Sequence, residues 1–176
     1  GIFYMPGVIK ASKLGDAAII KSIIKILNKE KIKVVRSNLY NPELTLNRGS
    51  YTQKKPNLSD MNSIKEGIKF LRKTNDFDHV QALVVKKDRV IAKEGREGTK
   101  KMLARLKKNS NAILIKLPKK KQDLRIDLPT IGLESLKDCK KKGIKGVVLQ
   151  SNKNIFLEKN ECINFANKNK IFIQVL

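Results

Sequence analysis

The chain has few of the residues that most often bind metals or act as nucleophiles: two of its 176 residues are cysteine and one is histidine. Cys139 and Cys162 have neither CxxC spacing nor the density of a disulfide-rich scaffold, so we expect both to be reduced thiols. His79 has no partner for a zinc cluster and no adjacent Ser or Cys motif, which predicts a surface or loop histidine. A serine or cysteine nucleophile activated by histidine is therefore not supported.

Long apolar runs and a secretory signal are also absent from the sequence. No stretch approaches the roughly 18 to 20 apolar residues that span a bilayer, and the first residues lack the pattern of a cleaved leader. We therefore expect a cytoplasmic protein. Hydrophobic residues make up 40% of the chain and come in regular blocks, which predicts a globular fold with one good core rather than a disordered basic tail.

Acidic residues are scarce beside basic ones, and the formal net charge is +23. Such a charge ordinarily favours nucleic acid, because basic surfaces release counterions when they neutralise phosphates. Only seven of the 39 basic residues are arginine, and there is no tryptophan. Arginine dominates bidentate base and phosphate recognition, and stacking on single strands needs aromatic rings. We therefore favour lysine-rich solvated faces and expect no nucleic acid, with a basic nucleic-acid-binding module as the alternative.

The common motifs of phosphate and zinc enzymes are missing as well. The sequence contains no Gly-rich P-loop, no dinucleotide-binding fingerprint and no HExxH. Water activated by a metal ion remains as a mechanism of hydrolysis, and it needs no histidine.

Apolar periodicity predicts alternating helices and strands. Helical spacing indicates helices over 17–29, with Asp16 as its cap, over 61–73, capped by Ser59 or Asp60, and over 98–107, 133–142 and 160–170. Short apolar runs predict strands over 33–35, 112–117, 146–150, 155–158 and 171–175, and a β-hairpin of 80–86 and 89–93. This alternation predicts an α/β fold with a mixed sheet. Residues 41–60 are polar and contain Pro and Gly, so we place a domain boundary there, between residues 1–57 and 58–176.

The first candidate site is the block 94–99, which leaves a hairpin strand and enters a helix. Exposed backbone N–H groups at such a helix start can hold an anionic oxygen, and the two glycines of the block permit close approach. Glu94 and Glu97 have a second interpretation, because carboxylates also stabilise a helix start through the helix dipole.

The second candidate site lies within residues 116–132. If 122–128 is extended, Asp123, Arg125 and Asp127 project from one face and supply both carboxylates for Mg²⁺ and a cation for phosphate. Four residues of strand cover roughly 13 Å, so Asp123 and Asp127 should not share one ion unless the chain bends. One would meet metal or phosphate while the other orients Arg125 or a backbone group. A buried structural ion pair is the alternative.

At these residues the chain resembles the UDP-2,3-diacylglucosamine diphosphatase family of lipid A biosynthesis, the two-domain α/β type. Three motifs match in order: Gln81 with the Glu94 to Thr99 block, then Lys116 with Lys119, then residues 122–132. The last resembles the family pattern QDxRxDLPtiG closely, and the likeness covers roughly residues 60–176. The helix that follows Asp16 resembles the end of the family's first domain.

The resemblance implies Mg²⁺-assisted hydrolysis of UDP-2,3-diacylglucosamine to lipid X and UMP, in a cleft between an N-terminal Rossmann-like domain and this C-terminal domain. It makes Asp127 the first choice for the catalytic or metal-binding carboxylate, followed by Asp123 and Glu97 as catalytic residues. The residues expected to bind the substrate are Gln81, Glu94, Thr99, Lys116, Gln122 and Arg125.

The resemblance also implies where the protein acts in the cell and that part of the family's first domain is missing from this chain. A diacylated substrate places the enzyme at the periphery of the inner membrane, where positive charge favours anionic lipid, and a homo-oligomer is possible. Most of the family's first domain, including its glycine-rich opening segment, has no counterpart here. We therefore expect a fragment in which residues 1–57 are a remnant of the first domain and its linker.

Overall fold

The computed structural model describes residues 6, 9, 12, 16–74, 80–108, 110–119 and 122–176. For residues 16, 17 and 74 it describes the backbone alone. Within them the fold is α/β with a mixed six-stranded sheet, as predicted. His79, the Asp16 side chain and Leu14–Gly15 lie outside this description, so the predictions made for them are not tested.

The main sheet has the strand order β1-β8-β6-β4-β2-β3. Its three central strands β8, β6 and β4 are parallel, whereas β2, β3 and β1 join as antiparallel strands. In this spatial order the strands are Gly49–Ser50, Phe172–Val175, Ile144–Leu149, Ala112–Lys116, Ala82–Lys86 and Arg89–Lys93. The predicted hairpin is confirmed, and Lys87 and Asp88 both have positive φ, as a type I′ turn requires.

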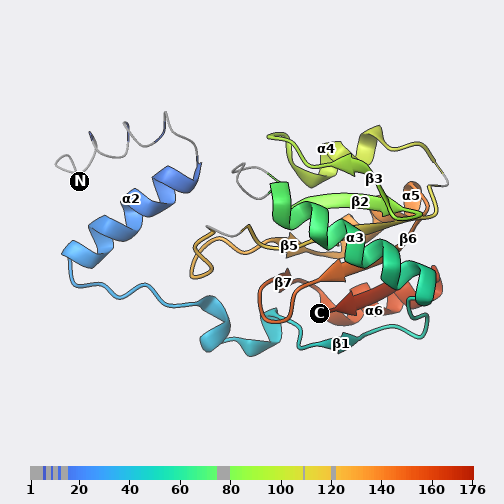
Figure 1. Ribbon diagram of the computed structural model, residues 1–176. Coiled ribbons are helices and arrows are strands. Elements are labelled where there is room, and N and C mark those ends of the chain that lie inside the picture. The colour runs from blue at the N-terminus through green and yellow to red at the C-terminus, as the bar shows by residue number, and fades with distance from the viewer. Residues whose placement is uncertain are drawn as a thin grey trace.

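Helices cover both faces of the sheet, but unequally (Figure 1). Helix α3 (Leu58–Thr74) packs against β2, β3 and β4 on one face, and its Ile64 and Leu71 share a core cluster with Leu83 and Ile115. The other face forms the larger cluster. The helices that cover it are α4 (Gly98–Arg105), α5 (Leu133–Lys141) and α6 (Lys159–Lys168). Every helix predicted from the sequence is present, with ends that differ by at most three residues.

Two glycines allow the α3 face to pack closely. A Cβ on Gly67 of α3 would lie 2.5 Å from Ile115 Cδ1 and 2.6 Å from Val85 Cγ1, so the helix backbone lies directly on the sheet. On β6, the ring of Phe172 covers Gly146, where a Cβ would meet ring carbons at 2.1 to 2.3 Å. The Gly67 contacts set the spacing between α3 and the strands beneath it, and Gly146 leaves room for the Phe172 ring over β6.

Helix α3 begins three residues before the predicted start, and its cap is Asn57 rather than Ser59 or Asp60. Asn57 Oδ1 accepts a hydrogen bond from the Asp60 backbone N–H at 2.8 Å, and Asp60 Oδ2 accepts one from the Asn57 N–H at 3.1 Å. This reciprocal pair is a capping box. Asp60 also forms an ion pair with Lys145 of β6 at 2.6 Å, which ties the helix start to the sheet.

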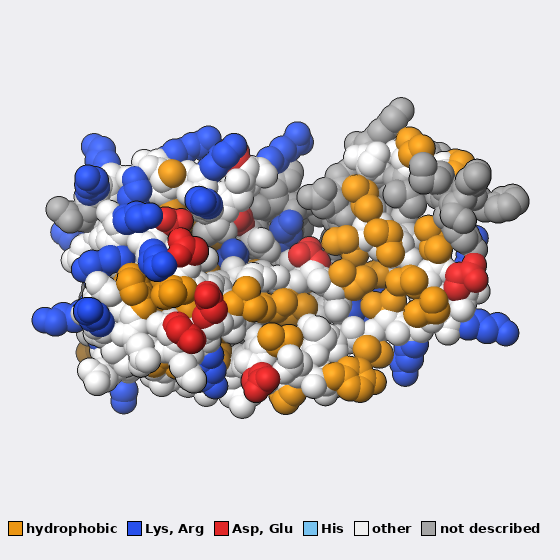
Figure 2. Space-filling view, turned by 180° about the vertical axis from the view of Figure 1, so that it is seen from behind, with side chains coloured by type: hydrophobic (Ala, Val, Ile, Leu, Met, Phe, Trp, Pro, Cys, Tyr) orange, Lys and Arg blue, Asp and Glu red, His pale blue; other side chains and the backbone are white. Residues whose placement is uncertain are grey.

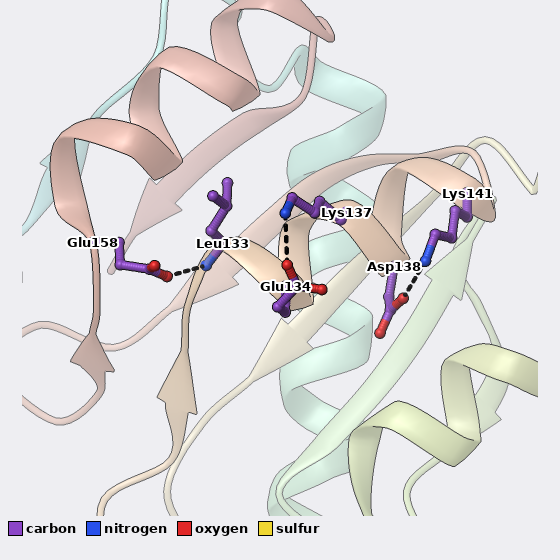
Figure 3. Close-up of polar contacts among 6 residues, drawn as sticks. All are labelled: Leu133, Glu134, Lys137, Asp138, Lys141 and Glu158. Carbon is purple, nitrogen blue, oxygen red and sulfur yellow. Dashed lines mark hydrogen bonds and ion pairs between the residues drawn. The ribbon is translucent and has the colours of Figure 1, made fainter.

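Helix α5 is held at its start by a residue from another element. Glu158, which precedes α6 with a φ of +50°, accepts a hydrogen bond from the Leu133 N–H through Oε2 at 3.2 Å (Figure 3). Strands β5 (Thr130–Ile131) and β7 (Ile155–Phe156) lie just before Leu133 and Glu158 and pair in parallel. Along α5, Glu134 pairs with Lys137 and Asp138 with Lys141.

The N-terminal part forms an arm beside the sheet (Figure 1). Helix α2 (Asp16–Lys29) was predicted correctly, and two 3-10 turns follow it, Ser37–Leu39 and Pro42–Leu44. The strand predicted for residues 33–35 is wrong: residues 32–36 have no regular structure. A short apolar run becomes a strand only if another strand edge pairs with it.

The segment before α3 already belongs to the sheet. Leu46 is buried in the larger core cluster, β1 pairs with β8, and Thr52 Oγ1 accepts a hydrogen bond from the Ile173 N–H at 2.9 Å. The boundary at 57/58 and the Rossmann-like character of the preceding residues stay predictions.

Candidate functional site

Polar and charged side chains gather where the strands end at one edge of the sheet. β4, β6 and β8 are parallel, so their carboxyl ends meet there, and open α/β sheets bind ligands outside these ends. A cavity of about 390 Å³ lies at this edge. Its lining from the strand ends and the following loops includes Leu117, Lys119, Gln122, Gln150 and Leu176.

The segment 122–128 is a turn, not the predicted strand. The backbone N–H groups of Ile126 and Asp127 both donate to the Asp123 carbonyl, at 3.1 and 2.9 Å. The alternating-face argument for Asp123, Arg125 and Asp127 therefore fails. The chain bends because Asp123 accepts a local hydrogen bond from the Arg125 N–H, an arrangement that competes with strand pairing.

Glu94 is the most buried carboxylate of the candidate site, with 3% of its surface exposed. Its Oε1 accepts a hydrogen bond from the Thr99 hydroxyl at 2.6 Å, and its Oε2 accepts one from the Gln81 backbone N–H at 3.1 Å. These contacts join the end of β3, the residue before β2 and the first turn of α4. The structure thus brings Gln81, Glu94 and Thr99 together.

Lys116, at the end of β4, is 8% exposed. Its Nζ donates a hydrogen bond to the Thr130 carbonyl at 2.9 Å. Burial lowers the pKa of Lys116, while the negative charge of Glu94 acts in the opposite direction. Lys116 therefore holds the loop after Pro129 to the end of β4 and adds one buried cation near the buried carboxylate of Glu94.

Gln122 extends this group toward the cavity. Its Nε2 lies 3.5 Å from Gln81 Oε1, at the outer limit of a hydrogen bond. Its Oε1 accepts a hydrogen bond from the Lys119 backbone N–H at 2.9 Å. Gln122 therefore links the Gln81–Glu94 contact to the cavity that it lines.

Asp123 and Arg125 form a bidentate ion pair with each other. Arg125 Nε donates to Asp123 Oδ1 at 2.9 Å and Nη2 to Oδ2 at 2.6 Å. The hydrogen bonds and charge of Arg125 lower the pKa of Asp123 to about 2, with a small contribution from Arg36 of the arm. Both groups are already paired, which matches the alternative of a structural ion pair, although this pair is partly exposed.

Glu97 is also engaged elsewhere, since its carboxylate forms an ion pair with Arg105 at the other end of α4. Its pKa is lowered, first by a hydrogen bond from its own backbone N–H and then by the charge of Arg105.

Asp127 differs from the other three carboxylates. It is half-buried and forms no hydrogen bond or ion pair through its carboxylate with any residue of the described ranges. No group of three or more His, Cys, Asp or Glu placed to hold a metal ion occurs within those ranges. Among the carboxylates of the candidate site, Asp127 is the one whose oxygens no described residue occupies, and a carboxylate of this kind could contribute one oxygen ligand to a divalent cation.

Asn154 is a buried polar residue at this edge that the sequence analysis missed. It is 2% exposed; its Nδ2 donates to the carbonyls of Lys116 at 3.0 Å and Pro129 at 3.4 Å, and its Oδ1 accepts from the Gln150 N–H at 2.8 Å. It therefore joins the ends of β4 and β6 to the loop that carries Asp127. Its sequence, Ser-Asn-Lys-Asn, is typical of an ordinary turn, so only the fold reveals this role.

No helix in the described residues is long and apolar enough to cross a membrane.

Comparison with known proteins finds one matching family and a related enzyme. The model of the LpxI C-terminal domain matches residues 47–174. A relative from Caulobacter vibrioides, the UDP-2,3-diacylglucosamine pyrophosphatase LpxI, is 28% identical over 183 residues. That alignment covers 98% of this chain and 65% of the relative, so the chain spans about two thirds of the relative's length.

The sheet, the ordered motifs at its edge and the extent of the match lead to one conclusion: the chain belongs to the LpxI C-terminal domain family.

Proposed function

We propose that this chain is the C-terminal part of a hydrolase that cleaves the diphosphate of UDP-2,3-diacylglucosamine into lipid X and UMP. The relative from Caulobacter vibrioides, a UDP-2,3-diacylglucosamine pyrophosphatase, supports this choice of substrate. The single structural observation that carries the proposal is Asp127, an uncommitted carboxylate on a loop that Lys116 and Asn154 fix to the sheet edge.

The proposed roles follow from the contacts. Glu94 and Lys116 form the buried floor of the site. Thr99 and the Gln81 backbone hold the Glu94 carboxylate in one orientation. Gln122 would donate from Nε2 to a phosphate oxygen, because its Oε1 is already occupied. Asp123 would hold Arg125 in place rather than act in the reaction, and Glu97 would stabilise α4.

Asp127 is the residue proposed to hold Mg²⁺, together with oxygens of the diphosphate. When bound, the ion would neutralise phosphate charge and lower the pKa of a bound water. The half-buried position of Asp127 leaves its carboxylate accessible to an ion that enters with the substrate.

We further propose a cytoplasmic location at the membrane periphery. Lysine and arginine side chains spread over the visible face of the sheet domain (Figure 2), and the net charge of +23 favours an anionic lipid surface.

The test of the activity is release of UMP from UDP-2,3-diacylglucosamine, detected by mass spectrometry with and without Mg²⁺. We expect Asp127→Asn to lower kcat/KM by about 100-fold or more, as for other groups that stabilise transition-state charge. Asp138→Asn, on α5 and paired with Lys141, is the matched control at a partly buried carboxylate and should leave the rate unchanged. Equal rates in the two variants would remove Asp127 from the site.

The alternative, a nucleic-acid-binding module, predicts a different outcome. It requires binding to generic RNA or DNA that weakens steeply with salt and is insensitive to Asp127→Asn. Such binding without UMP release would reject the hydrolase.

A further inference from the structure

A second, larger cavity runs beside α3. It has a volume of about 840 Å³ and is lined mainly by one stripe of the helix together with the C-terminal residue. Its apolar lining consists of Met61, Ile64, Ile68 and Leu176. A volume of this size lies within the roughly 300 to 1,000 Å³ of typical ligand sites.

The groove exists because α3 covers only part of its face of the sheet. The helix packs over β2, β3 and β4, and Gly67 draws its backbone close to Ile115 and Val85. Three helices cover the opposite face, whereas on this face the groove lies between α3 and the residue that follows β8, Leu176. An apolar groove of this kind selects an apolar ligand.

The rim of this groove is cationic. Four basic side chains line it: Lys65, Lys69, Arg72 and Lys73. Of these, Lys69 lies 3.9 Å from Glu66, a long and exposed contact that offsets little of the charge. An apolar floor with a cationic rim is complementary to an anionic amphiphile, and it would be a poor site for a neutral or cationic one.

The groove is continuous with the candidate site. The 390 Å³ cavity at the sheet edge shares Ile68, Arg72 and Leu176 with the groove, and Lys119 and Gln122 also line it. A ligand that extends from Gln122 past Ile68 would therefore enter the α3 groove without leaving the surface of the protein.

We propose that the α3 groove holds an acyl chain of the same anionic lipid whose phosphate lies at Gln122. This inference rests on the proposed function for the identity of the lipid, and it adds the place where the apolar part binds. Arg72, which lines both cavities, stands where the acyl chain leaves the polar headgroup.

Two probes separate the groove from the phosphate site. Binding of alkyl phosphates of eight to twelve carbons, below their micellar concentrations, reports on both parts of the ligand, whereas inorganic pyrophosphate reports on the phosphate site alone. Isothermal titration calorimetry with the whole chain should show alkyl phosphate affinity rising severalfold for each added pair of methylenes.

Two variants on the same helix provide the comparison. Met61→Glu places a carboxylate at the groove and should weaken dodecyl phosphate binding about tenfold. Leu58→Glu makes the same kind of change at an exposed position of α3 that does not line the groove, and it should alter affinity less than twofold. Pyrophosphate affinity should be equal in both variants and the parent chain.

The outcomes distinguish the two proposals. Pyrophosphate binding with a dodecyl phosphate affinity that is the same in Met61→Glu and Leu58→Glu would overturn the groove and leave the phosphate site standing. Chain-length-dependent binding that Met61→Glu abolishes, without any pyrophosphate binding, would support the groove and reject the phosphate site. Absence of alkyl phosphate binding would overturn the groove.

Discussion

Glu94 has a buried carboxylate whose two oxygens are both used, one by the Thr99 hydroxyl and one by the Gln81 backbone. We expect Thr99→Val to lower the free energy of unfolding by about 1–3 kcal/mol, because it leaves a buried acceptor without its donor. Thr99→Ser keeps the hydroxyl and should lose clearly less. Urea denaturation followed by circular dichroism measures both. Similar losses in the two variants would mean that the methyl group, not the hydrogen bond, matters at this position.

Asp123 should contribute a pH-dependent part of the stability. Its pKa is about 2 in the folded chain, below its ordinary value of 3.8. The contribution is thus fully present above about pH 4 and is lost as the pH falls through about 2. The difference in free energy of unfolding between the parent chain and Asp123→Asn should shrink over that interval. Arg125→Gln should reproduce the effect, because it removes the cation that lowers the pKa. A difference that stays constant from pH 5 to pH 2 would contradict the ion pair.

The sequence predicted which residues lie close together better than it predicted the contacts that they make. Glu94 and Thr99 were grouped by their positions along the chain, and the structure joins them directly. Asp123 and Arg125 were expected on a strand face, but their hydrogen bonds to each other require a turn. Asn154 has no local pattern that separates it from a turn residue, because its partners lie 25 and 38 positions away. Long-range partners depend on the fold, which local periodicity does not encode.

At the scale of the elements, substitutions at Asn57 and Ser59 can test which residue caps the start of α3. Asn57→Ala removes one half of the capping box and should lower the free energy of unfolding by about 1 kcal/mol. Ser59→Ala changes a residue that the sequence also offered as a cap, but it should have little effect. Thermal or urea denaturation gives both values, and a larger loss for Ser59→Ala would contradict the cap assignment.

The packing of β6 beside β8 depends on the absence of a Cβ atom at Gly146. Gly146→Ala would drive a Cβ into the Phe172 ring, and we expect a loss of about 1–3 kcal/mol from overpacking. Combined with Phe172→Leu, the same substitution should cost less than the sum of the two single changes, because the ring that it meets is gone. Strict additivity, measured by urea denaturation of all four chains, would show that Gly146 is needed for another reason.

Helices were easier to predict than strand pairing. The five predicted helices follow from apolar spacing, which reports directly on one buried side. Residues 33–35 have the composition of a strand and no neighbouring edge, whereas Gly49–Ser50 has little strand character and pairs with β8. Whether a segment becomes a strand is therefore decided by what lies beside it in space.

At the scale of the whole molecule, α4, α5 and α6 cover one face of the sheet and α3 covers the other, within the residues that the structure describes. Neither the order of strands nor the single helix on the α3 face could be predicted from the sequence, since both depend on how the crossovers run. The arm that carries α2 exposes apolar side chains, among them Ile23 and Ile32, and Figure 2 shows hydrophobic atoms gathered on it.

The two cysteines lie on the face of the sheet that α3 does not cover, Cys139 on α5 and Cys162 on α6. Both side chains are fully buried, and burial raises the pKa of each thiol to about 12. Neither should react with a thiol reagent such as DTNB at pH 8 in the folded chain, whereas both should react in denaturant. Rapid modification without denaturant would contradict the burial. Cys139 and Cys162 are thus native sensors of helix detachment: the rate at which they become labelled would report how often α5 and α6 lift from the strands, with no dye or engineered probe.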